Sequence, residues 1–180
     1  PAAQLTRISQ RAHTMVQEQS EGISAVLQAL QEEGIHVLPA QQWAQEDRDH
    51  LTQYFVKQIL PILTPLAVED LDPVPLLPGV QLQVAVLLEH TSEEANDTKR
   101  RNVAVVPVPT QLKRFIPLAG DGCLRFALLE DVIAANAELA FPGCRVEAAT
   151  CFRITRDADV GVRDDDAGDL LHAIEEAVLA

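Results

Sequence analysis

The chain has 180 residues, 47% of them hydrophobic, and a formal net charge of -13 at pH 7. This composition is typical of a globular protein with one domain, or one domain and an appendage, and it argues against a disordered chain. So acidic a chain repels nucleic acid and anionic membranes, so binding to either is not expected. The sequence also lacks the roughly 18 consecutive apolar residues of a membrane span.

The N-terminal region is predicted to form one long amphipathic helix that ends at Gly34. Its apolar residues recur at spacings of three, four and seven. They are Leu5, Ile8, Ala12, Met15, Val16, Ile23, Val26, Leu27 and Leu30. The chain opens directly on this pattern and closes on another helical pattern at residues 170–178. We therefore expect both ends to be cut from a larger protein.

The middle of the chain alternates between helical and strand patterns. Helices are predicted over residues 44–60 and 129–140, ended by Pro61 and by Pro142 with Gly143. Alternating apolar residues predict strands at 80–89, 103–109, 114–118, 123–129 and 145–156. Because strand pairs lie beside helices without regular βαβ alternation, we expect an α+β fold. Its sheet should be largely antiparallel and covered by helices, and the long N-terminal helix should precede it.

The cysteines and the N-terminus predict a cytoplasmic protein. Cys123, Cys144 and Cys151 are odd in number and have no CxxC spacing, which is typical of free thiols in a reducing compartment. The first twenty residues lack the apolar run of a signal peptide.

No motif for catalysis, metal binding or cofactor binding is found in the sequence. Gly120 and Gly122 are too isolated to form a phosphate-binding loop, and the aspartates at 164–166 are typical of a helix N-terminus. The histidines lack the spacing of a metal site. They are His13, His36, His50, His90 and His172. We therefore predict no catalytic residue, metal site or cofactor within the chain.

The stretch FRITRDADV, residues 152–160, leaves two interpretations open. Arg153 should point to the opposite side of the strand from its two neighbours, and Arg156 follows where the strand gives way to a loop. Two arginines at a strand end can bind phosphate oxygens bidentately. Equally, Asp157 and Asp159 can pair with them and stabilise the turn.

Several stretches in a fixed order carry a resemblance to a known family. They are QEQSEGISAVLQALQEEGI, YFVKQILPILTPLAVEDLDPVPLL, RFIPL, FALLEDVIAANAELAFPG, and FRITRDADV followed by DDDAGDLLHAIEEAVLA. Together they cover nearly the whole chain, and they resemble the histidine-dependent polyphosphate kinases. The resemblance implies that residues 1–34 are the end of that family's N-terminal helical domain. Residues 35–180 would be its middle, or head, domain.

The resemblance also implies what the parent enzyme does. Such an enzyme reversibly transfers the terminal phosphate of ATP to polyphosphate through a phosphohistidine, with Mg²⁺ bound. The groups that perform this chemistry belong to C-terminal domains that would follow Ala180, and none of the five histidines here matches the family's catalytic motif. The chain alone is therefore predicted to be inactive.

The head domain of the family contributes to dimerisation and to the wall of the tunnel in which phosphate is transferred. The expected partners are thus the missing N-terminal and C-terminal domains, a second copy in a homo-oligomer, and ATP, ADP and polyphosphate in the parent. Arg153 and Arg156 are candidates to face the polyphosphate tunnel. The alternative is a free-standing protein-interaction module that shares the fold.

Overall fold

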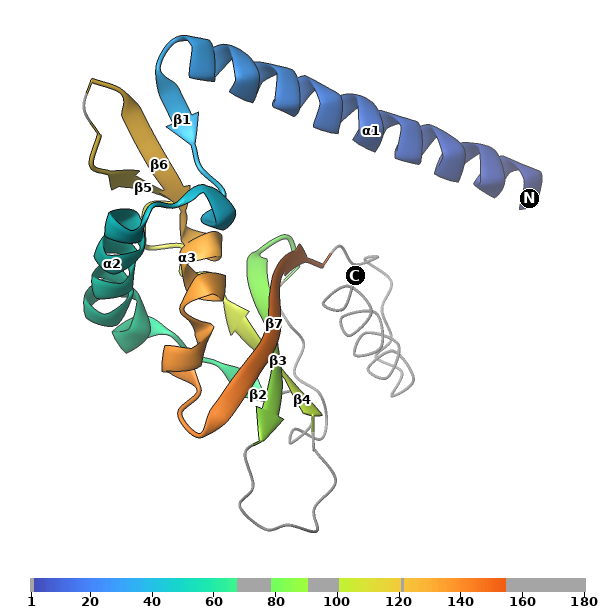
Figure 1. Ribbon diagram of the computed structural model, residues 1–180. Helices are drawn as coiled ribbons and strands as arrows, with labels where there is room; N and C mark the ends of the chain where they lie inside the picture. The colour runs from blue at the N-terminus through green and yellow to red at the C-terminus, as the bar shows by residue number, and fades with distance from the viewer. Residues whose placement is uncertain (1, 68–78, 91–100, 121, 155–180) are drawn as a thin grey trace.

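The computed structural model describes residues 2–67, 79–90, 101–120 and 122–154 (Figure 1). Arg156, the aspartates at 164–166 and the helix expected at the end of the chain lie outside the described residues. Within the described ranges, no helix is long and apolar enough to cross a membrane.

The N-terminal helix α1 (Ala2–Glu32) is confirmed as a single long helix that extends away from the rest of the chain (Figure 1). Gly34 ends it with φ 78°, a left-handed conformation that glycine adopts without steric cost. The large apolar side chains of the stripe from Leu5 to Leu27 are open to solvent, with exposures from 39% at Leu27 to 66% at Leu5, whereas Leu30 is half-buried. The helix therefore presents an apolar face that the described residues do not bury.

The second predicted helix changes geometry before it ends. The α-helix α2 (Gln45–Tyr54) continues as a π-helical turn, η2 (Phe55–Ile59), and then as a 3₁₀ turn, η3 (Leu60–Ile62). Pro61 has no N–H, and its ring would collide with the carbonyl four residues earlier in an α-helix. The last turns therefore depart from α geometry, and the Leu60 N–H bonds to the Phe55 carbonyl.

The strands form two sheets rather than one. The smaller sheet has the order β1–β6–β5, in which β1 is parallel to β6 and β5 is antiparallel to it. Its strands are β1 (Ile35–Val37), β6 (Leu124–Leu128) and β5 (Phe115–Leu118). The predicted hairpin is confirmed, with Pro117 opposite Phe126. The strand β1 has no counterpart in the predictions, because three residues are too short for a pattern of alternation.

The larger sheet is antiparallel throughout, in the order β2–β4–β3–β7. Its strands are β2 (Leu66–Ala67), β4 (Arg101–Pro107), β3 (Leu82–His90) and β7 (Cys144–Arg153). The α+β fold, with a long N-terminal helix and largely antiparallel pairing, is therefore confirmed.

Two clusters of buried side chains lie on opposite faces of the larger sheet. On one face, α2, η2 and α3 (Leu129–Ala135) pack against alternate residues of β3 and β4, such as Val84 and Val106 (Figure 1). On the other face, Ala85, Leu87 and Val105 form a second cluster. The central strand β3 is thus buried on both faces over most of its length, although an alternating pattern is typical of a strand that is buried on one face. The predicted helix at 129–140 is α3 followed by a 3₁₀ turn, η4 (Ala137–Ala140).

Candidate functional site

Three separate stretches of the chain meet at the start of α3. Arg114 immediately precedes β5, Glu130 and Asp131 lie in the first turn of α3, and Cys151 lies near the end of β7. The Leu129 N–H donates to the Arg114 carbonyl at 2.8 Å, which joins the start of α3 to the start of β5. These residues belong to the stretches RFIPL, FALLEDVI and the strand that leads into FRIT, so distant motifs form one site.

An ion pair joins Arg114 to Glu130 at this site. The Arg114 Nε and Nη2 both donate to Glu130 Oε1, at 2.8 and 2.5 Å. The Glu130 side chain is only 5% exposed, whereas that of Arg114 is 53% exposed. Glu130 Oε2 is buried and has no hydrogen-bond partner. Hydrogen bonding to Glu130 raises the pKa of Arg114, so the guanidinium carries its charge at every relevant pH.

The neighbouring titratable groups respond to the same environment. Burial, followed by the charge of Glu130, raises the pKa of the Asp131 carboxyl. The same two causes, in the same order, raise the pKa of the Cys151 thiol. Although Cys151 is exposed as a residue, its raised thiol pKa suppresses the thiolate, so the site offers no activated cysteine. The positive charge of Arg114 partly opposes this rise in the pKa of the Cys151 thiol.

Arg153 lies at the last position of β7, opposite Leu82, and its side chain is exposed. Alternation is confirmed, because Phe152 and Ile154 pack against the cluster on the other face of the sheet. Arg153 therefore shares a face with Cys151, about 7 Å further along the strand. No described residue forms an ion pair or side-chain hydrogen bond with Arg153. Arg156, Asp157 and Asp159 lie outside the described residues.

Arg114 and Glu130 are absent from the residues that the sequence singles out. The sequence does mark both positions, because Glu130 and Asp131 interrupt an otherwise apolar run and Arg114 directly precedes a strand. Only the tertiary structure pairs them, since they are separated by a complete hairpin.

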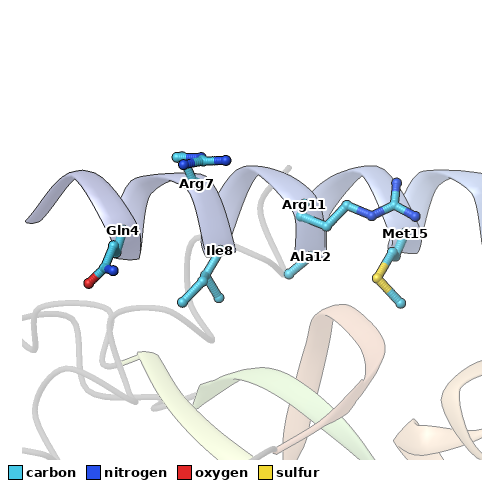
Figure 2. Close-up of a pocket in the computed structure, with 6 residues that line it drawn as sticks. All are labelled: Gln4, Arg7, Ile8, Arg11, Ala12 and Met15. Carbon is cyan, nitrogen blue, oxygen red and sulfur yellow. The ribbon is translucent and has the colours of Figure 1, made fainter. Parts of the chain in front are cut away.

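Two hollows elsewhere on the molecule carry no evident chemistry. One, of about 380 Å³, lies between α2 and the β5–β6 hairpin, beside the buried Asp47–Arg125 ion pair. The other, of about 830 Å³, runs along α1 (Figure 2). Its described lining residues are Gln4, Arg7, Ile8, Arg11, Ala12 and Met15, all from this one helix.

The described histidines do not assemble a site either. His13 bonds the Ser9 carbonyl on its own helix at 2.8 Å, and His50 lies on the wall of the smaller hollow. Across the described ranges, no three His, Cys, Asp or Glu side chains are grouped so that they could hold a metal ion.

Comparison with known proteins connects these stretches to one family. Residues 46–180 match the family described as the polyphosphate kinase middle domain. A polyphosphate kinase from Bacillus cereus is 38% identical over 178 residues, which are 98% of this chain and 25% of the relative. One from Bacillus anthracis is 40% identical over 180 residues, again 98% of this chain and 25% of the relative. The chain thus spans about a quarter of the length of these relatives.

A solved structure gives the same family. The crystal structure of a polyphosphate kinase from Porphyromonas gingivalis superposes with a TM-score of 0.65 and 25% sequence identity. The match covers 77% of this chain and 21% of that one.

Proposed function

Because the chain belongs to the polyphosphate kinase family and matches its middle domain, we propose that it is the head domain of a larger polyphosphate kinase. The span of about a quarter of the relatives' length supports this proposal. The division into residues 1–34, from an N-terminal helical domain, and residues 35–180, the head domain, is part of it. This boundary falls between the end of α1 and the start of β1.

In the proposed parent enzyme, the terminal phosphate of ATP passes to polyphosphate through a phosphohistidine that lies outside this chain. The Mg²⁺ that the resemblance implies is proposed to bind at the same outside site. The head domain then supplies shape, contacts to other domains and part of the wall along which polyphosphate lies. We place the enzyme in the cytoplasm as a homo-oligomer, and the exposed apolar stripe of α1 supports coverage of that helix by a further domain or a second copy.

The exposed guanidinium of Arg153 is the observation that carries the proposed contact with polyphosphate. It lies at the end of β7 without a described partner, beside a site built from three stretches that resemble the family. A cation with no structural partner is suited to bind phosphate oxygens. We propose that Arg153, Arg156 or both face the polyphosphate tunnel.

The test replaces Arg153 and Arg156 separately by Ala in the full-length enzyme that contains this chain. Loss of a phosphate contact should raise the KM for polyphosphate or lower kcat, with little change in melting temperature. Arg101→Ala is the matched control, since Arg101 is an exposed arginine in the same sheet that pairs with Glu147 at 2.9 Å. Reduced stability with normal kinetics in the Arg153 and Arg156 variants would instead support the structural interpretation of both arginines.

The chain by itself is proposed to be inactive. The purified 180-residue chain should neither make polyphosphate from ATP nor become labelled on histidine by radioactive ATP. A cooperative thermal melt must first show that it is folded. Acid-labile phosphate on any of its five histidines would place the nucleophile within this chain and contradict the proposal.

The alternative is a free-standing interaction module with the same fold, and it predicts a different reading frame after Ala180. Sequencing the reading frame beyond Ala180 decides between them. Further domains that contain catalytic histidines support the kinase, whereas a stop codon at that point supports the module.

A further inference from the structure

The guanidinium of Arg114 is engaged along only one edge. A guanidinium has five N–H donors. The Nε N–H and one Nη2 N–H bond Glu130 Oε1, and the described part of the chain provides no other hydrogen-bond partner for this side chain. The Nη1 donors and the second Nη2 N–H are therefore available, and the side chain is 53% exposed. An open guanidinium edge matches the spacing of two phosphate oxygens.

Glu130 holds Arg114 in this orientation. Its side chain is 5% exposed, and Arg114 supplies its only described side-chain hydrogen bonds. The second oxygen is buried without a partner. Withdrawal of Arg114 would leave a buried carboxylate with no compensating charge, which is strongly unfavourable. Arg114 is thus fixed by one edge to the protein interior, while its other edge stays open to solvent.

A second cation lies on the same side of the sheet. Arg153 shares a face of β7 with Cys151, and that face is the one against which α3 packs. Leu82, opposite Arg153, packs against the same buried cluster as Leu129 of α3, which directly precedes Glu130. Glu130 and Asp131 offset the two positive charges, so a broad positive potential is not expected here. Binding would depend on direct hydrogen bonds from the guanidinium groups to an anion.

We propose that Arg114, positioned by Glu130, binds phosphate oxygens of a phosphoanhydride chain together with Arg153. This inference rests on the proposed function, because that function identifies the anion as a phosphoanhydride. The chain could come from polyphosphate or from the phosphates of ATP. Tripolyphosphate and ATP are therefore separate probes.

The first experiment compares Arg114→Gln with Arg101→Gln in the full-length protein. The two arginines have similar exposure, 53% and 54%, and each pairs with a glutamate, so the variants lose the same charge. Arg114→Gln should weaken binding of tripolyphosphate by about 10- to 100-fold in calorimetry, and Arg101→Gln should not. Added salt should also weaken tripolyphosphate binding less in Arg114→Gln than in the wild type, because one charged contact with the anion is lost.

A second experiment tests the positioning role of Glu130. Removal of a negative charge beside an anion site strengthens anion binding if the glutamate is a bystander. If Glu130 instead holds Arg114, Glu130→Gln should weaken tripolyphosphate binding despite the more favourable charge. Unchanged or tighter binding in this variant contradicts the positioning role.

The outcomes separate this inference from the proposed function. A loss of affinity for ATP but not for tripolyphosphate assigns the site to nucleotide phosphates, and still supports binding by Arg114. Equal affinities for both probes in Arg114→Gln and wild type overturn the inference, even if the enzyme makes polyphosphate. A wild-type protein that makes no polyphosphate from ATP refutes the proposed function, and the same binding comparison still decides the role of Arg114.

Discussion

Replacement of Asp47 by Ala tests how α2 is held against the smaller sheet. The Asp47 side chain is 5% exposed and accepts hydrogen bonds from Arg125 Nη2 at 2.5 Å and Nη1 at 3.3 Å. Its Oδ2 also accepts the Ala44 N–H at 3.1 Å, at the start of α2. A single carboxylate therefore caps the helix and connects it to β6.

The stability that Asp47→Ala should lose can be worked out from these contacts. Breaking a buried ion pair from one side typically costs about 3–5 kcal/mol, and losing a helix cap costs about 1 kcal/mol. Arg125 is 24% exposed and keeps a bond to the Ala119 carbonyl at 2.8 Å, so its stranded charge is partly solvated. This solvation should lower the cost of the broken ion pair to about 2 kcal/mol. With the lost cap, we therefore expect a total loss of about 3 kcal/mol in the free energy of unfolding. For a chain of this size the melting temperature should fall by about 6–12 °C.

Urea denaturation followed by circular dichroism measures this loss. Glu46→Ala, one residue earlier and exposed, is the control and should change stability by less than about 0.5 kcal/mol. The double variant Asp47→Ala with Arg125→Met should recover part of the loss, because it removes the unpaired charge. A cost below about 1 kcal/mol for Asp47→Ala, or a double variant with the sum of the single losses, would refute the reasoning.

Three further predictions concern the long helix and the site at α3. Deletion of residues 1–20 removes only exposed turns of α1, so a monomer with a cooperative melt should remain; loss of that melt would place the helix in the core. Burial raises the pKa of Asp131 above its ordinary value of 3.8, so the folded chain holds this proton to higher pH than the unfolded chain. The contribution of this proton to stability is present below pH 3.8 and is lost as pH rises through the folded pKa. Asp131→Asn should therefore raise the melting temperature at pH 7. It should also weaken the dependence of stability on pH just above 3.8. A lower melting temperature at pH 7 in this variant would contradict that assignment. Because burial suppresses its thiolate, Cys151 should react more slowly with iodoacetamide in the native chain than in urea, and equal rates would argue against the burial.

Elements with a long, regular pattern could be predicted from the sequence alone. The helix α1 follows from apolar spacing over 31 residues and a glycine at its end, and its recognition needs no partner. The β5–β6 hairpin and the alternation around Arg153 follow from a period of two and from local turn residues. In each case the element is determined by residues that are close together in the sequence, so it can be predicted without knowledge of tertiary contacts.

Other features depend on contacts between distant residues. The strand β1 exists because three residues pair with β6, almost ninety positions later, and the burial of β3 on both faces depends on what packs against each side. The same is true of the candidate site. The sequence does not pair Arg114 with Glu130, and it leaves two possible roles for Arg153. Only the packing of α3 against the β5–β6 hairpin buries one member of the pair and leaves the other exposed, because burial and charge pairing are properties of the assembled fold.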